Sequence, residues 1–140
     1  MTDSRNTKNI FIIVTNRCNL RCVYCYEQGK NTVSANKETM QHVLGHELAD
    51  ENFDSFDIVF HGGEPFMEWH MVRELSEWLW KYYSSRHIRL MATTNGTMLN
   101  EEIKSWLSEN RERFALILSL DGGRETHNRN RCNSYDKIDF

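Results

Sequence analysis

The sequence predicts an α/β protein with a parallel sheet of about four strands and three to four helices. Four short apolar segments, residues 10–14, 56–60, 88–93 and 114–120, are rich in Ile, Val, Leu or Phe and too short for helices. Stretches with helical spacing of apolar residues lie between them. Since parallel strands need crossover connections, this alternation favours right-handed strand–helix–strand units, arranged either as an open doubly wound sheet or as part of a barrel.

The first predicted helix covers residues 37–51, and Asn36 is its expected N-cap. Its expected buried face consists of Met40, Val43, Leu44 and Leu48. His42 and His46 fall opposite that face, so we expect them to be solvated rather than metal ligands.

The second predicted helix covers residues 68–83. Its expected packing stripe consists of Met71, Val72, Leu75, Trp78, Leu79 and Tyr82. The third is shorter and starts after Asn100, a suitable cap, with acidic residues in its first turn. Its expected buried face consists of Ile103, Trp106 and Leu107. Residues 121–133 read as a loop, and residues 134–140 as the first turn or two of a further helix.

The composition is that of a single globular domain. The chain has 140 residues, 39% of them hydrophobic, and a formal net charge of −3, which gives no general attraction to nucleic acid or to an anionic membrane. The first nine residues are polar, and no apolar run approaches the roughly 20 residues of a membrane-spanning helix. We therefore expect a cytoplasmic protein with no nucleic-acid or membrane partner.

Chemically distinctive residues follow all four predicted strands. A cysteine-containing loop follows the first, residues 61–65 (HGGEP) the second, residues 94–97 (TNGT) the third, and residues 119–123 (SLDGG) the fourth. Because the carboxyl ends of parallel strands meet on one face, where α/β proteins bind ligands, we expect these loops to form one site.

Three cysteines, Cys18, Cys22 and Cys25, are crowded into the first of these loops. Three thiolates at this spacing can hold a cubic iron–sulfur cluster and leave one iron open for chemistry. The alternatives are three core cysteines, or a structural zinc site completed by a histidine. Arg17 and Arg21 flank the cysteines, where positive charge favours thiolates. The fourth cysteine, Cys132, is isolated, and we expect a packed or free thiol.

The loop after the second strand combines Gly62 and Gly63 with Pro65, the only proline of the chain. Two residues without side chains let the backbone approach a small ligand, while the proline fixes the turn. Tyr24, between two of the cysteines, is placed to contact a bound adenine or to pack under the loop. Asn95 and Gly96 form a common turn signal at the third strand end.

Together, the cysteine motif with Tyr24, the run from Gly62 to Pro65 and the two later strand-end loops resemble the radical S-adenosylmethionine superfamily over residues 10–140. Asp121 and Gly122, followed by His127 and Arg131, resemble its branch of sulfatase-maturing and SPASM-type peptide-modifying enzymes. That branch often has aspartate where this chain has Asn128.

The resemblance implies a partial (β/α) TIM-like barrel. Cys18, Cys22 and Cys25 would hold a 4Fe-4S cluster, whose open iron binds S-adenosylmethionine. Reductive cleavage would give methionine and a 5'-deoxyadenosyl radical that abstracts hydrogen from a peptide or protein. A low-potential donor such as flavodoxin or ferredoxin would supply the electron. The implied cofactor-binding residues are Tyr24, Gly62, Gly63, Glu64, Asn95 and Ser119, with Ser119 as a ribose contact.

Family members of this branch continue through two more strands of a six-strand partial barrel. Residues 1–140 therefore look like the amino-terminal part of a radical S-adenosylmethionine core, with an apolar edge at residues 114–120. Two alternatives to a peptide-modifying enzyme remain at this point: a noncatalytic iron–sulfur or zinc module, and a radical enzyme acting on a small metabolite.

Overall fold

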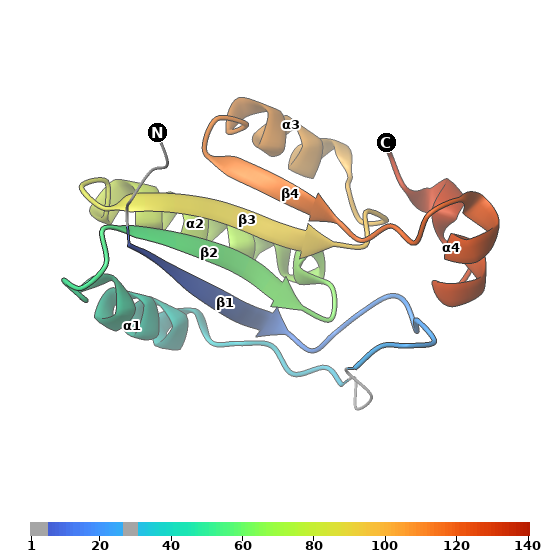
Figure 1. Ribbon diagram of the computed structural model, residues 1–140, viewed down its shortest axis with the longest axis horizontal. Helices are drawn as coiled ribbons and strands as arrows, with labels where there is room; N and C mark the ends of the chain where they lie inside the picture. Colours follow the sequence, from blue (N-terminus) through green and yellow to red (C-terminus); the bar gives the residue numbers. More distant parts are fainter. Residues whose placement is uncertain (1–5, 27–30) are drawn as a thin grey trace.

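The computed structural model describes residues 6–26 and 31–140, so of the polar stretch at residues 1–9 the first five lie outside it. Four strands form one sheet in the order β1-β2-β3-β4, with every neighbouring pair parallel. They are β1 (Thr7–Thr15), β2 (Ser55–Gly62), β3 (His87–Thr94) and β4 (Phe114–Leu118). Their carboxyl ends lie at one edge of the sheet (Figure 1), which confirms the predicted parallel α/β class. The fourth strand ends at Leu118, earlier than expected.

Three helices connect consecutive strands: α1 (Lys37–Leu48), α2 (Trp69–Tyr82) and α3 (Glu101–Glu109). A short 3-10 turn, η1 (Pro65–Glu68), precedes α2. Both predicted caps are confirmed, because Asn36 Oδ1 accepts the N–H of Thr39 and Asn100 Oδ1 that of Ile103, each at 2.9 Å. None of the helices in the described part of the chain is long and apolar enough to span a membrane.

The helices cover one face of the sheet. Consecutive strands are neighbours, and right-handed crossovers that always step in the same direction place their helices on the same side. A single hydrophobic core agrees with this arrangement, since it joins alternate side chains of β1, β2 and β3 to side chains of all three connecting helices. Its members include Ile12, Val14, Leu44, Leu48, Phe56, Ile58, Phe60, Val72, Leu75, Leu79, Leu90, Ala92, Ile103, Trp106 and Phe114. The architecture is therefore part of a (β/α) barrel wall, not a doubly wound sheet.

Two residues assigned to buried helix faces are exposed instead. Val43 on α1 has 46% of its surface exposed, because the buried face of this helix is narrow and only Leu44 and Leu48 are fully buried. Tyr82 is 63% exposed, since it lies in the last turn of α2 and packs beside Trp78 at the surface. Both predictions were wrong because helical spacing fixes the direction of a side chain but not the width of the surface that covers it.

The segment after β4 differs from the sequence prediction. Residues expected to form a loop contain a helix, α4 (Arg124–Asn130), and the expected further helix is only a 3-10 turn, η2 (Tyr135–Lys137). A buried histidine organises this segment: His127 Nδ1 accepts the N–H of Asp121 at 3.2 Å, and its Nε2 lies 3.1 Å from Ser134 Oγ. Because these contacts are polar and centre on a buried histidine, hydrophobic periodicity did not reveal the helix.

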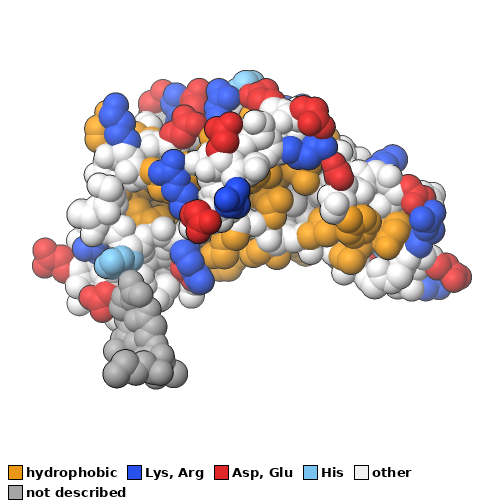
Figure 2. Space-filling view, turned by 90° about the horizontal axis from the view of Figure 1, so that it is seen from above, with side chains coloured by type: hydrophobic (Ala, Val, Ile, Leu, Met, Phe, Trp, Pro, Cys, Tyr) orange, Lys and Arg blue, Asp and Glu red, His pale blue; other side chains and the backbone are white. Residues whose placement is uncertain are grey.

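The face of the sheet opposite the helices, and the β4 edge, expose apolar side chains. Phe11 and Ile13 on β1 are 67% and 49% exposed. On β4, Leu116, Ile117 and Leu118 are all at least 38% exposed, which confirms the predicted apolar edge. A view from the β4 side shows hydrophobic side chains gathered across the middle of the molecule (Figure 2).

Candidate functional site

The loops at the carboxyl edge of the sheet enclose a cavity of ≈ 120 Å³. Every strand contributes to its lining, through the strand end itself or the segment that follows it. The lining residues are Cys18, Leu20, Cys22, Tyr24, Cys25, Tyr26, His61, Gly62, Gly63, Thr93, Thr94, Asn95, Ser119 and Arg131. The structure thus brings together every site residue predicted from the sequence except Glu64, which does not line the cavity.

The cysteine loop is fastened to the end of β2 by two backbone hydrogen bonds. Gly63 N donates to Thr15 O at 2.9 Å, and Glu64 N donates to Arg17 O at 2.7 Å. The β1–β2 pairing shifts register between Ile13 and Thr15, immediately before the loop. Such an irregularity bends the strand at its end, which directs the chain across the sheet edge towards the cavity.

The two glycines at the end of β2 are needed for this close approach. A Cβ on Gly62 would lie 2.3 Å from Thr15 O, and one on Gly63 would lie 2.2 Å from Arg17 O. Gly62 also has a φ of 146°, which side-chain-bearing residues rarely adopt. Both glycines line the cavity. They must lack a side chain because the backbone of residues 15–17 lies directly against them.

The Glu64 side chain ties β2 to β3. Its carboxylate is 1% exposed and accepts hydrogen bonds from Thr94 Oγ1 (2.8 Å), Asn95 N (2.8 Å) and Phe66 N (3.2 Å). Burial raises the pKa of Glu64, and the three donors oppose that rise. The side chain predicted to line the cofactor therefore supports the loops that do line the cavity.

The loop after β3 is joined to the cysteine loop by amide side chains. Asn95 is 7% exposed, and its Nδ2 donates to Asn19 Oδ1 at 2.9 Å. Asn19 Nδ2 in turn donates to Thr97 Oγ1 at 2.7 Å. Ser119, at the end of β4, is held by its N–H, which donates to Thr94 O at 2.9 Å. These bonds fix the relative positions of three walls of the cavity.

Asp121 connects the cysteine loop to α4. Its carboxylate accepts hydrogen bonds from Tyr24 Oη, at 2.6 and 2.8 Å to the two oxygens, from Arg131 Nε at 2.9 Å and from Asn130 Nδ2 at 3.3 Å. Burial acts to raise the pKa of Asp121, but these three donors outweigh it and hold that pKa below its usual value. Partial burial and the Asp121 carboxylate raise the pKa of Tyr24 to about 12.

The guanidinium of Arg131, an arginine outside the motif, approaches the sulfur of Cys22. Arg17 pairs with Glu68 at 3.3 Å, and Arg21 donates to the carbonyls of Cys18 (2.7 Å) and Leu20 (2.8 Å). Arg131 lies 109 positions from Cys22, and its guanidinium nitrogen is 3.7 Å from Cys22 Sγ. Its only sequence signal is its place after the Asp-Gly and His pattern, because nothing local links it to the cysteines.

The cysteines have the chemistry of an iron–sulfur donor set. None of the four cysteines forms a disulfide, and Cys18, Cys22 and Cys25 are partly exposed towards one cavity. Within residues 6–26 and 31–140, no three His, Cys, Asp or Glu side chains surround a single metal-ion position. A cubic cluster does not need such a grouping, since each thiolate binds a different iron. The donor set therefore fits a cluster.

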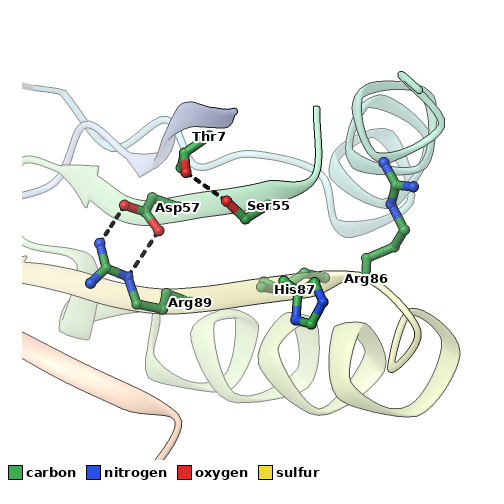
Figure 3. A pocket seen from close by; sticks show the side chains of 7 residues that line it. Thr7, Ser55, Asp57, Arg86, His87 and Arg89 are labelled. Atoms are coloured by element: carbon green, nitrogen blue, oxygen red, sulfur yellow. Dashed lines mark hydrogen bonds and ion pairs between the residues drawn. The ribbon is translucent and has the colours of Figure 1, made fainter. Parts of the chain in front are cut away.

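A larger hollow of ≈ 570 Å³ lies at the other end of the sheet, beside the amino ends of β2 and β3. Four of its polar side chains are engaged with one another (Figure 3): Arg89 forms a two-point ion pair with Asp57 (2.9 and 2.5 Å), and Thr7 Oγ1 lies 2.5 Å from Ser55 Oγ. Ligands of parallel α/β proteins bind at the carboxyl ends of the strands. The smaller cavity, which holds the cysteines and the glycine loops, is therefore the candidate site.

Comparison with known families agrees with this choice. The family model described as the Radical SAM superfamily matches residues 12–139. The chain belongs to the radical SAM superfamily.

Among curated radical SAM relatives, the Fe-coproporphyrin III synthase of Methanosarcina barkeri is 37% identical over 83% of this chain and 28% of its own length. The serine-type anaerobic sulfatase-maturating enzyme of Bacteroides thetaiotaomicron is 34% identical over 88% of this chain and 31% of its own. The solved structure of native anSMEcpe with bound AdoMet and Kp18Cys peptide superimposes with a TM-score of 0.79 at 29% identity, over 94% of this chain and 38% of that one.

Membership of the radical SAM superfamily implies S-adenosylmethionine and an iron–sulfur cluster as cofactors. It also identifies the fold as the TIM-like barrel type of this superfamily, and confirms the resemblance to the amino-terminal region of sulfatase-maturating enzymes. The chain spans about a third of the length of the curated relatives it matches.

Proposed function

We propose that residues 1–140 form the amino-terminal part of a radical SAM enzyme core. Cys18, Cys22 and Cys25 are the ligands of a 4Fe-4S cluster, and S-adenosylmethionine occupies the adjoining cavity. The observation that carries this proposal is the convergence of three cysteine side chains, two glycines and polar groups of β3 and β4 on one cavity at the carboxyl edge of the sheet. When bound, the cluster supplies the electron that cleaves S-adenosylmethionine to methionine and a 5'-deoxyadenosyl radical, which takes hydrogen from substrate.

The residues of the chain bind and orient this cofactor. Gly62, Gly63 and Asn95 present backbone and amide groups to it, Ser119 offers a hydroxyl to its ribose, and Tyr24 lies beside its adenine. Glu64 acts from behind the cavity, by holding the β3 loop against β2. A low-potential donor such as flavodoxin or ferredoxin supplies the electron, and the reducing cytoplasm is the compartment that keeps the thiols reduced.

A peptide or protein is the proposed substrate. This proposal is supported by similarity to a sulfatase-maturating enzyme and to a solved structure with a bound peptide. A small metabolite is the second candidate, because a relative named for the synthesis of Fe-coproporphyrin III is of comparable similarity. Peptide and porphyrin substrates therefore form the two arms of a substrate test.

Anaerobic reconstitution with iron and sulfide tests the proposal directly. The wild-type chain should bind iron and, with S-adenosylmethionine and dithionite, produce 5'-deoxyadenosine. Cys22→Ser should lose most of the iron and the product. Cys132→Ser is the matched control, because Cys132 does not line the cavity and serine keeps an acceptor for the Arg21 N–H, and it should retain both. A cluster without 5'-deoxyadenosine would favour a noncatalytic iron–sulfur module, and a colourless zinc protein would refute the proposal.

A further inference from the structure

The cysteine loop and the end of α4 are joined on both sides of one residue pair. Val23 N donates to Asn130 O at 2.9 Å, and Arg21 N donates to Cys132 Sγ at 3.2 Å. Cys22 lies between the two donor residues, Arg21 and Val23. Arg131 lies between the two acceptor residues, Asn130 and Cys132. The two contacts therefore hold the backbones of residues 21–23 and 130–132 side by side and set Arg131 against Cys22.

The Arg131 side chain is fixed as well as its backbone. Nε bonds to Asp121 Oδ1 at 2.9 Å, the guanidinium carbon lies 5.3 Å from the centre of the Tyr24 ring, and a terminal nitrogen is 3.7 Å from Cys22 Sγ. The side chains of Arg131 and Asp121 are only 15% and 17% exposed, so water screens this group of charges weakly. A guanidinium is always charged, and its rigid fork can serve the carboxylate and the sulfur together.

From this juxtaposition, we propose that Arg131 is a positioning and tuning residue that donates a hydrogen bond to the Cys22 thiolate and thereby raises the reduction potential of the cluster. The inference rests on the proposed function, because it requires Cys22 to be a cluster ligand. Reduction adds one electron, taken from a low-potential one-electron donor, to a centre that already carries thiolate charge. A fixed positive charge and a hydrogen bond to a ligand sulfur stabilise the more negative reduced state.

A redox titration of the reconstituted full chain tests the inference. Dithionite is the reductant, and the reduced cluster is followed by its visible absorption and its electron paramagnetic resonance signal. Arg131→Gln should lower the equilibrium constant for reduction about tenfold, a fall in midpoint potential of about 59 mV. Arg131→Lys keeps the charge but not the fork, so its potential should fall between those of Arg131→Gln and wild type.

Arg124→Gln is the matched control, since Arg124 is the first residue of α4, the helix that ends just before Arg131, is exposed, and pairs with Asp136 away from the cysteines. It removes the same charge and should leave the potential unchanged. The inference would be overturned if the equilibrium constant for reduction of Arg131→Gln were within twofold of the wild-type value. It would also be overturned if Arg124→Gln lowered the midpoint potential as much as Arg131→Gln does.

The outcomes also separate this inference from the proposed function. If the wild-type chain binds no cluster, both the proposed function and the role of Arg131 are refuted. If it binds a cluster whose midpoint potential does not change with substitution at position 131, only the role of Arg131 is refuted. If Arg131→Gln does not retain a cluster, Arg131→Lys decides the question. A lowered potential in that variant supports the hydrogen bond, and a wild-type potential contradicts it.

Discussion

The carboxylate of Glu64, at the end of β2, accepts the backbone N–H of Asn95, at the end of β3, at 2.8 Å. The same carboxylate accepts bonds from Thr94 and Phe66, so one buried side chain satisfies donors of the segments that follow β2 and β3. In a parallel sheet the strand ends are not linked by short turns, and a buried acceptor of this kind gives two neighbouring loops a common anchor. The relative positions of the loops that line the cavity therefore depend on Glu64, a residue outside the lining.

Glu64→Gln should destabilise the chain and loosen the loop after β3. Glutamine has an NH₂ group in place of one carboxylate oxygen. That group cannot accept the hydrogen bonds that Thr94, Asn95 and Phe66 donate to the two oxygens of Glu64. The expected loss in the free energy of unfolding is about 2 kcal/mol, the range for hydrogen bonds to a charged group. Urea unfolding followed by circular dichroism measures it. Glu112→Gln, at an exposed position, is the control and should stay within about 0.5 kcal/mol of wild type.

Gly63→Ser should displace the cysteine loop, because its Cβ would lie 2.2 Å from Arg17 O. Overpacking of this kind costs about 1–3 kcal/mol. The variant should also bind less iron after anaerobic reconstitution, since the displaced backbone carries Cys18. Thermal unfolding and iron content per chain are the two measurements.

Gly123→Ser is the matched control for that prediction. A Cβ at Gly123 meets nothing within 4 Å, and serine is a favourable N-cap at the start of α4. This variant should keep wild-type stability and iron content. Equal iron loss in both variants would show that the close approach at Gly63 does not position the loop.

The strands and helix caps were predictable because their causes are local. Short β-branched runs mark buried strands, and Asn36 and Asn100 cap helices whose first turns follow directly. The cavity was predictable for a topological reason, since carboxyl ends of parallel strands must meet. In contrast, the Arg131–Cys22 contact joins partners far apart in the chain, and the α4 segment and the tie formed by Glu64 depend on burial of a polar side chain. Neither distance nor burial of a polar group can be read from a single sequence.

His127 should make stability fall at acidic pH. The ring is buried and neutral: Nδ1 accepts the N–H of Asp121, so Nε2 carries the proton and donates to Ser134 Oγ. Burial lowers the pKa of His127, and Arg131 acts in the same direction, while Asp121 opposes it. At mildly acidic pH, the His127 imidazole therefore binds a proton in the unfolded chain but not in the folded chain. The free energy of unfolding should decrease as the pH falls below the ordinary histidine value of about 6.5.

The measurement is the free energy of unfolding between pH 7 and pH 5. His127→Gln should be less stable at pH 7, by about 1–3 kcal/mol for the lost bonds, but should show a shallower decrease with acid. His46→Gln, whose side chain is 83% exposed, should retain the wild-type slope. A slope for His127→Gln equal to that of wild type would contradict the prediction.

Ile117→Lys should reduce self-association of the chain without unfolding it. β4 is an edge strand in the described structure, and Ile117 is 44% exposed beside Leu116 and Leu118. Exposed apolar edge strands pair with other chains, and an edge lysine opposes that pairing. The new charge lies in water, so the free energy of unfolding should change by no more than about 0.5 kcal/mol.

Analytical ultracentrifugation over a range of concentrations tests the edge prediction. Wild type should show a larger concentration-dependent rise in mean sedimentation coefficient than Ile117→Lys. Ser108→Lys adds the same charge at an exposed position of α3, away from the β4 edge, and should behave as wild type. If Ser108→Lys suppresses association equally, the cause is net charge. Only a specific effect of position 117 identifies the β4 edge as the surface through which copies associate.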